Sequence, residues 1–401
     1  MKEAGMPAEQ RRGEDLLKSV RDFVEEEVKP TVSRLDLEDE YPQAHVDRMR
    51  ELGLFGTLIP QEYGGLGLPL QDYARIIIEL SRGWMSLAGV LNSHFVSAWM
   101  IERFGTDEQR TEHLPRMATG EVRAAISMTE PHGGSDLQAI KTVARREGEA
   151  FAIEGEKMWC TNGLHASIIM LLTKTDLGAE PRHKGMTTFV VEKRPGVHQQ
   201  PGLEIPPLLE KLGYRGLEGT RMNWNEFKTP VSSALGGEEG VGRGFKQFMA
   251  GIEVGRINVA ARAVGIALAS YESAMDWART RTTFGKPIAQ HQLIGAKLAD
   301  MATKIRAAYL LTIEAARKKD AGERADLDAG AAKLFATELA EEAAFESMRI
   351  HGGAGYLRDA DVARYYRDAP VLIIGEGSSE IQRIVIARRL VELAESGGSL
   401  I

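Results

Sequence analysis

The chain has 401 residues, of which 43% are hydrophobic and 27% are charged, and its 50 basic and 57 acidic side chains give a formal net charge of −7. This length predicts two or three domains, because a single hydrophobic core stops growing at about 250–300 residues. The negative charge argues against nucleic acid and anionic membrane surfaces as partners. No apolar run approaches the ~20 residues that span a bilayer, so we expect no membrane insertion.

Two further features bear on location and metal binding. The polar segment of residues 1–13 lacks the apolar stretch of a secretory signal. The single cysteine, Cys160, can form neither an internal disulfide nor a thiolate metal cluster. Both features predict a cytoplasmic protein, and no residues stand at metal-ligand spacing, so we expect no metal site.

The first part of the chain, from about residue 14 to residue 120, has a helical pattern. Apolar residues at spacings of three and four predict a helix over residues 16–28, which Pro30 ends or kinks. The same pattern predicts helices over residues 70–81 and 87–104, the second of them buried.

Short runs rich in β-branched residues follow, between about residues 122 and 230. They are separated by Gly, Pro and Asn clusters and lie at residues 142–144, 151–153, 157–161, 168–173, 187–191 and 220–227. Because no helical stretch links them, we expect antiparallel strands in a small barrel or sandwich.

The last part is helical again, with long Ala-rich segments at residues 243–280, 292–320, 326–351 and 379–395. Four such helices joined by short loops predict a bundle. Ser379 followed by Gln382 is typical of a capping box at the start of the last one. The chain is therefore predicted to be an α+β protein with domains at residues 1–121, 122–232 and 233–401.

Two motifs in the β part suit a flat or anionic ligand. Residues 127–136 combine Pro131 with Gly133 and Gly134, so their backbone N–H groups can approach a ligand closely. Trp159 and Thr161 lie on one side of a predicted strand, where an aromatic ring can stack on a heterocycle while the hydroxyl binds its edge. The alternatives are an ordinary turn at a domain entry and a core tryptophan.

Two motifs lie between the predicted bundle helices. Within residues 281–292, Arg281 can bind a phosphate, or it is a solvated side chain in a helix connection. Residues 349–356 hold three glycines within four positions. Gly352 alone would serve as a helix cap, whereas the additional glycines indicate that something packs against the backbone.

Glu376 stands between two glycines, after the apolar residues 371–374 and before the capped helix. Burial at the edge of a core would raise the pKa of this carboxyl group, whereas the adjacent helix N-terminus would lower it. The sequence leaves open which effect is larger. A carboxylate tuned in this way can act as a general base; the alternative is an exposed loop glutamate.

These five motifs, in this order and within helical, β and helical regions, resemble those of the acyl-CoA dehydrogenase family over about residues 16–393. The resemblance implies an N-terminal helical domain, a middle antiparallel β-barrel and a C-terminal four-helix bundle. It implies FAD as cofactor and a homotetramer built as a dimer of dimers. It also implies α,β-dehydrogenation of an acyl-CoA to the trans-2-enoyl-CoA, with electrons passed to electron-transfer flavoprotein.

The resemblance also implies roles for single residues. Glu376 corresponds to the catalytic base; some members place the base directly before Arg256, where this chain has Gly255. The residues implied to contact substrate are Ser135, Glu253, Arg256 and Gly377. Those implied to bind FAD are Met128, Thr129, Gly134, Ser135, Trp159, Thr161, Arg281, Phe284, Gln292, Arg349, Gly352, Gly353, Ser378 and Glu380, with the set from Arg281 to Gly353 supplied by a neighbouring subunit.

Two departures from the family pattern stand out. Arg349 replaces a glutamine that many members carry, and His94 lies on a helix that lines the acyl pocket in relatives. His94 either makes that pocket shorter or more polar, or is a hydrogen-bonded core histidine. An acyl-CoA oxidase and a DNA-associated alkylation-response protein are the alternative activities. The short C-terminal tail and the negative charge favour a dehydrogenase.

Overall fold

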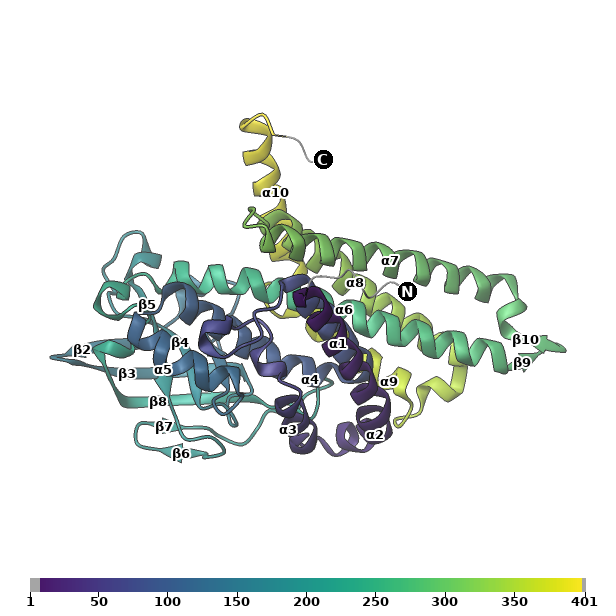
Figure 1. Cartoon of the computed structure of the whole chain (residues 1–401), viewed down its shortest axis with the longest axis horizontal. Coiled ribbons are helices and arrows are strands. Elements are labelled where there is room, and N and C mark those ends of the chain that lie inside the picture. Colours follow the sequence, from purple (N-terminus) through teal and green to yellow (C-terminus); the bar gives the residue numbers. More distant parts are fainter. Residues whose placement is uncertain (1–7, 399–401) are drawn as a thin grey trace.

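The computed structural model describes residues 8–398 as helices, then a β-sheet, then helices again. Figure 1 shows an elongated molecule with the sheet at one end and the tips of two long helices at the other. Residues 1–7, the start of the segment expected to lack a targeting signal, lie outside the described residues. No described helix is both long and apolar enough to cross a membrane.

The N-terminal helix continues past Pro30 instead of ending there. Helix α1 (Ala8–Phe23) leads into a single wider π-helical turn (Val24–Val28) and then into α2 (Lys29–Glu38), in which Pro30 occupies the first turn. Proline lacks an N–H and displaces the carbonyl of the preceding turn, so the wider turn is the irregularity that accommodates it.

Helix α4 (Leu70–Phe104) runs through the centre of the molecule and is almost wholly buried. The two predicted helices at residues 70–81 and 87–104 meet in it at a kink, where Trp84 has φ −156° and ψ 113°. The shorter helices α3 (Gln43–Glu51) and α5 (Asp107–Ala118) complete this domain. Packing of α4 against α6 (Gly244–Thr280) joins the N-terminal domain to the C-terminal helices.

The middle region is an eight-stranded sheet with the strand order β1-β4-β2-β3-β8-β7-β6, and β5 pairs with β4. Its pairs are antiparallel apart from β1 with β4, which is parallel, and a single parallel residue pair between β2 and β4. The strands are β1 (Ala124–Ser127), β2 (Val143–Glu147), β3 (Ala150–Thr161), β4 (Ile168–Lys174), β5 (Met186–Glu192), β6 (Gln199–Gln200), β7 (Leu203–Glu204) and β8 (Gly219–Pro230).

A register shift between β3 and β8 determines how Trp159 is oriented. The two strands lose their regular pairing between Lys157 and Cys160. Within this irregularity Trp159 takes φ +62°, a left-handed conformation that is uncommon for a bulky residue. The distortion re-aims the tryptophan, whose side chain is 53% exposed, so the core-tryptophan alternative is wrong.

The C-terminal helices are α6, α7 (Gln292–Asp320), α8 (Asp326–His351), α9 (Asp361–Ile374) and α10 (Ser379–Glu395). Four of them lie where the sequence predicts them, whereas α9 was not predicted. The hairpin of β9 (Thr282–Thr283) and β10 (Lys286–Pro287) joins α6 to α7 at the end of the molecule farthest from the sheet (Figure 1). Helix α10 projects away from the other helices (Figure 1).

Candidate active site

Glu376 lies in the tight turn between α9 and α10, and its carboxylate is directed into the seam between α4 and α6. Glu376 and Gly377 both have left-handed backbones, with φ of +54° and +85°. Asn92 of α4 donates to Oε1 of Glu376, and Nη2 of Arg262 from α6 lies 3.5 Å from the same oxygen. The side chain is 12% exposed, which rules out the exposed-loop alternative.

Burial raises the pKa of Glu376, and this effect exceeds the lowering by Arg262, by the Asn92 hydrogen bond and by Lys333. Of the two opposing effects expected from the sequence, burial is therefore the larger, and the pKa of Glu376 is raised. A carboxylate with a raised pKa is a stronger base once ionised, and its protonated form suits a buried site.

The side chains of Lys333 and Gln382 hydrogen-bond to the backbone of the turn that carries Glu376. Lys333 of α8 is fully buried, and its ammonium group donates to the carbonyl oxygens of Gly377 at 2.9 Å and Ile373 at 3.3 Å. Gln382 donates to the carbonyl oxygens of Glu376 at 3.3 Å and Gly377 at 3.1 Å. Burial lowers the pKa of Lys333 to about 8.

The predicted capping pair of Ser379 with Gln382 is wrong. The cap is Ser378, whose hydroxyl accepts from the N–H of Ile381 at 3.5 Å. Gln382 turns back to the Glu376 turn, because that turn offers it two carbonyl oxygens. Ser378 thus has a structural partner, and Glu380 is exposed in the first turn of α10.

Gly255 of α6 faces the free oxygen of the carboxylate. A Cβ on Gly255 would overlap Oε2 of Glu376, an atom that is buried and has no hydrogen-bond partner. Glycine is therefore the residue that leaves room for Glu376 in this position. Arg256, the next residue, is largely buried with an unpartnered Nε, and burial lowers its pKa. Glu253 instead pairs with Lys319 of α7 at 2.7 Å.

The loop at residues 128–136 is anchored by a buried ion pair. Lys157 of β3 is fully buried, and its ammonium group lies 3.0 Å from Glu130 and donates to the carbonyl oxygen of Met128 at 3.0 Å. The Glu130 carboxylate also accepts from both the N–H and the hydroxyl of Thr142. Burial lowers the pKa of Lys157 to about 8. Neither member of this pair was among the predicted site residues.

This anchoring places the predicted loop residues at the surface beside Trp159. The carbonyl oxygen of Thr129 accepts from the N–H of Met158 at 2.8 Å, which joins the loop to β3. Gly134 and Ser135 are exposed, and a Cβ on Gly134 would come within 3.2 Å of the Thr129 side chain. An exposed aromatic ring, hydroxyl groups and open backbone N–H groups are thus brought together.

The remaining predicted cofactor residues lie elsewhere in this chain. Phe284, 96% exposed with φ +52°, sits in the β9–β10 hairpin, which is at the opposite end from the sheet (Figure 1). Trp277 stacks on His351 at 5.0 Å, so the glycine-rich end of α8 lies at this same end. The exposed residues there are Arg281, Phe284, Gln292, Arg349, Gly352 and Gly353. A single chain does not bring them to Trp159.

His94 does not reach Glu376. Its Nε2 lies 3.1 Å from the carbonyl oxygen of Phe55, and its ring packs against Phe55 and Phe95. Burial lowers the pKa of His94 to about 4. The structure supports the alternative of a hydrogen-bonded core histidine, and Asn92, two residues earlier, is the residue of α4 that contacts the carboxylate.

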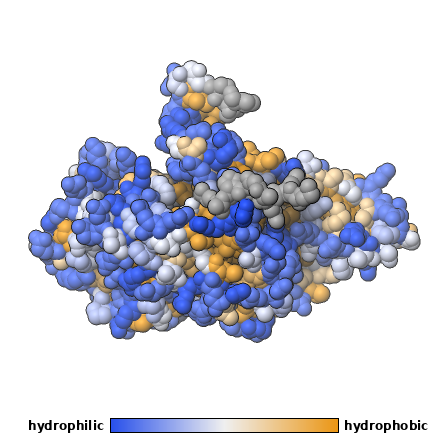
Figure 2. All heavy atoms as spheres, in the orientation of Figure 1, coloured by the Kyte–Doolittle hydropathy of each residue, from blue (hydrophilic) through white to orange (hydrophobic). Residues whose placement is uncertain are grey.

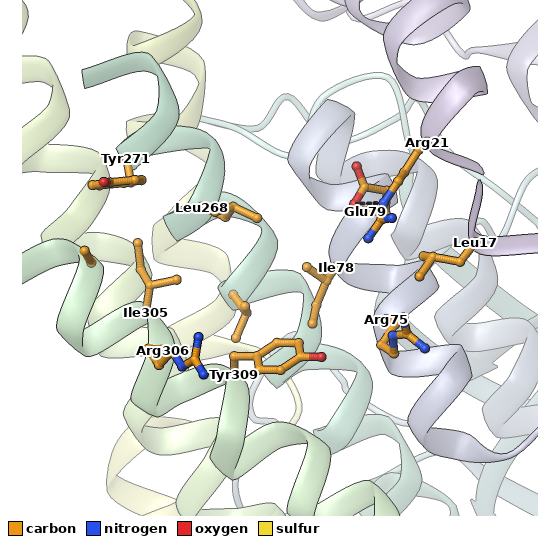
Figure 3. A pocket seen from close by; sticks show the side chains of 12 residues that line it. Leu17, Arg21, Arg75, Ile78, Glu79, Leu268, Tyr271, Ile305, Arg306 and Tyr309 are labelled. Atoms are coloured by element: carbon orange, nitrogen blue, oxygen red, sulfur yellow. Dashed lines mark hydrogen bonds and ion pairs between the residues drawn. The ribbon is translucent and has the colours of Figure 1, made fainter. Parts of the chain in front are cut away.

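Two other features lie away from this site. A hollow of about 380 Å³ between α1, α4, α6 and α7 is lined by apolar side chains, two tyrosines, three arginines and Glu79, and none of the predicted site residues borders it (Figure 3). Glu112, His113 and Glu192 hold possible metal-ligand atoms within 4.8 Å of one another. Arg116 lies 3.9 Å from Glu192 and competes with any cation for that carboxylate.

Comparison with known proteins identifies the family. The descriptions "Acyl-CoA dehydrogenase, N-terminal domain", "middle domain" and "C-terminal domain" match residues 10–121, 125–227 and 242–391. This chain belongs to the acyl-CoA dehydrogenase family. It is 38% identical to an acyl-CoA dehydrogenase of Bacillus subtilis (strain 168), over 93% of this chain and 96% of the relative. The predicted α+β fold and the assignment as an oxidoreductase are confirmed.

Two further similarities are informative about the range of relatives. A (2S)-methylsuccinyl-CoA dehydrogenase of Cereibacter sphaeroides is 37% identical over 93% of this chain and 68% of the relative. The solved butyryl-CoA dehydrogenase of Megasphaera elsdenii has a TM-score of 0.90 at 32% identity, over 95% of this chain and 98% of that one.

Acyl-CoA dehydrogenases are FAD-dependent, and the residues present here fit that cofactor. The exposed Trp159 ring can cover the isoalloxazine, and hydroxyl groups are available on Thr161 of the same strand and on Thr129 of the loop joined to that strand. The exposed loop at Gly134 and Ser135, where Gly134 leaves room for the Thr129 side chain, can present its backbone N–H groups to a pyrophosphate.

Proposed function

We propose that this acyl-CoA dehydrogenase uses Glu376 to remove the α-proton of a CoA thioester and forms the trans-2-enoyl-CoA. The observation that carries this proposal is the geometry of one carboxylate. Oε1 of Glu376 is engaged by Asn92 and Arg262, whereas Oε2 is buried and has no partner. An oriented carboxylate with one free oxygen and a raised pKa is what proton abstraction from a weak carbon acid requires.

The protein's part of the reaction follows from the contacts around Glu376. Lys333 and Gln382 hold the backbone of the turn, so the base is fixed before substrate arrives. Burial excludes water from the carboxylate and favours the neutral form that it takes after accepting the proton. We assign the backbone N–H of Glu376 to the developing enolate oxygen, as the family resemblance implies.

Bound FAD would supply the hydride acceptor for the β-carbon. We assign Trp159, Met128, Thr129 and Thr161 to holding the flavin ring, and Gly134 with Ser135 to the pyrophosphate. Ser378 and Glu380 are assigned to the same site. Substrate contacts are assigned to Ser135, Glu253, Arg256 and Gly377.

A homotetramer, arranged as a dimer of dimers, would complete the cofactor site. The predicted cofactor residues from Arg281 to Gly353 lie at the end of the chain opposite the sheet that carries Trp159, which supports their supply by a neighbouring subunit (Figure 1). Large exposed apolar side chains also concentrate on the C-terminal helices, whereas the end with the sheet is mostly hydrophilic (Figure 2). These side chains include Leu293, Leu310, Phe335, Phe345, Ile384 and Val391. Apolar patches of this kind mark subunit interfaces.

We propose electron-transfer flavoprotein as the electron acceptor. A solved structure described as an electron transferring flavoprotein of Acidaminococcus fermentans shares the fold, with a TM-score of 0.90 at 32% identity over 97% of this chain and 99% of that one. Peroxide formation in air, compared with the reduction of added electron-transfer flavoprotein, separates a dehydrogenase from an oxidase.

The proposal is tested by offering the purified FAD-loaded enzyme a panel of saturated CoA thioesters with a dye acceptor. We expect at least one thioester to reduce the dye and to yield a product two hydrogen atoms lighter. The absence of turnover with every member of the panel, in enzyme that carries a full complement of FAD, would contradict it.

A further inference from the structure

Arg262 is a buried cation whose hydrogen-bonding capacity is not used up. It is 5% exposed on α6. Its Nη1 donates to the hydroxyl of Tyr214 at 3.1 Å, and its Nη2 lies 3.5 Å from Oε1 of Glu376, at the limit of hydrogen bonding. Its Nε is buried and has no partner. A guanidinium group has five N–H donors, so this one can bind a further acceptor.

The surroundings of Glu376 hold more positive than negative charge. Arg256, Arg262 and Lys333 all act on the carboxylate, and each is largely removed from water. Glu253, another acid on this part of α6, is paired with Lys319. Within residues 8–398, Glu376 is the carboxylate that forms an ion pair with Arg262. This balance of charge favours a ligand that brings a negative charge of its own.

Proton transfer makes this imbalance larger. When Glu376 accepts the α-proton it becomes neutral, and Arg262 loses the anion that it faces. A buried charge without a partner is destabilising by several kcal/mol, so this loss opposes the reaction of a substrate with an apolar acyl chain. A carboxylate on the substrate remains ionised throughout, and it would compensate Arg262 before and after proton transfer.

Tyr214 packs beside Arg262 and adds a second polar group to this part of the seam. The Tyr214 hydroxyl packs so closely against α4 that a Cβ on Gly89 would overlap it. Tyr214 is fixed there by its N–H, which donates to the buried Asp368 at 2.6 Å, and by its left-handed backbone, with φ +55°. Tyr214 and Arg262 thus form a polar wall across the seam between α4 and α6, beside Asn92 and Glu376.

We propose that Arg262 binds a carboxylate carried by the acyl group, so that the substrate is a short CoA thioester whose second acid group lies one or two bonds beyond its β-carbon. This assignment rests on the proposed dehydrogenation at Glu376 and adds the chemical class of its substrate. The acid group must be close to the reacting carbons, because Arg262 itself lies 3.5 Å from the base.

The test compares charged and uncharged substrates with the FAD-loaded wild-type enzyme. Glutaryl-CoA and methylsuccinyl-CoA are measured against the same thioesters with the free acid converted to a methyl ester, and against butyryl-CoA and hexanoyl-CoA. We expect kcat/KM to be about 100-fold higher for the acids, as for a buried charge pair worth about 3 kcal/mol. Equal or higher kcat/KM for the uncharged thioesters would overturn the inference and leave the proposed dehydrogenation intact. No turnover of any thioester would overturn the proposed function, and this inference with it.

Variants then test Arg262 itself. Arg262→Gln is expected to lower turnover of every thioester, because Arg262 also contacts Glu376, but to lower kcat/KM for the acids much more and so to abolish their preference. Arg262→Lys should keep part of the preference. Arg279→Gln, on the same helix but with a side chain 71% exposed, is the matched control and should change nothing. An undiminished preference in Arg262→Gln, or an equal loss with all substrates, would contradict the assignment. The wild-type comparison decides the substrate class even when a variant does not fold.

Discussion

Gly255 and Glu376 occupy one space: the free oxygen of the carboxylate lies where a side chain on residue 255 would begin. Gly255 lies on α6 and Glu376 lies in the turn before α10, so the two residues are 121 positions apart in the chain. The absence of a side chain on Gly255 therefore determines where the proposed base can sit.

Gly255→Ala should displace the carboxylate and lower kcat/KM by about 100-fold, because a shift of about 1 Å at a reacting group has costs of that size. FAD content should be unchanged, since Gly255 is not among the proposed cofactor residues. Gly295→Ala on α7 is the control, because the nearest atom to its new Cβ would be 3.7 Å away. Full activity in Gly255→Ala would show that Glu376 tolerates displacement, contrary to this account.

The pH profile should report the environment of Glu376. Burial raises the pKa of this carboxyl group, and a base must be ionised to act, so kcat/KM should fall as the pH drops through that raised pKa. The hydrogen bond that Asn92 donates to Glu376 acts in the opposite direction and lowers the pKa of the carboxyl group. Asn92→Leu should therefore shift the acid limb of the profile to higher pH. An acid limb in the same place in both proteins would exclude this contact as a determinant.

Lys333→Met should lower kcat by about tenfold while KM and FAD content change little. The substitution removes the donor to the Gly377 and Ile373 carbonyl oxygens, so the Glu376 turn is held less firmly. Lys304→Met, at a half-exposed ion pair with Glu342, serves as the control and should leave kcat unaltered. Wild-type kcat in Lys333→Met would mean that Gln382 alone holds the turn.

Lys157→Met should destabilise the protein and weaken FAD retention together. Removing one member of a buried ion pair leaves Glu130 uncompensated, which costs about 3–5 kcal/mol. The double variant with Glu130→Gln should recover part of the loss in thermal unfolding experiments. Lys228→Met, whose side chain is 52% exposed, should differ little from wild type. A double variant no more stable than Lys157→Met would rule out the unpaired charge as the cause.

Much of the architecture could be predicted because its signals are local. Helices α7, α8 and α10 lie at the predicted residues, since each is long, rich in Ala and bounded by turn residues. Helix α9 was missed, although Val362, Tyr365, Ala369 and Leu372 recur at helical spacing and are buried. Pro370 near its end and its short length concealed that pattern.

The site could be predicted only in part. The flanking glycines and the apolar run before Glu376 made it a candidate, and the resemblance to the family gave it the role of base. Its partners Asn92, Arg262 and Lys333 come from three different helices and were not predicted. Lys333 does carry a local signal, as a charged residue on the buried stripe of Gly330, Thr337 and Ala340. Asn92 and Arg262 carry no comparable signal, because their importance depends on how α4 and α6 pack. The exposure of Trp159 likewise depends on a register shift between two strands.

The central claim is that Glu376 is the base. Its most direct test is anaerobic flavin reduction, followed by stopped flow, when an oxidisable CoA thioester is mixed with FAD-loaded wild type or Glu376→Gln. The amide keeps the size of the side chain but cannot accept the proton, so we expect reduction to be slower by about 1,000-fold with FAD content unchanged. Glu314→Gln on the exposed face of α7 should reduce its flavin at the wild-type rate. Reduction within tenfold of wild type in Glu376→Gln would contradict the account.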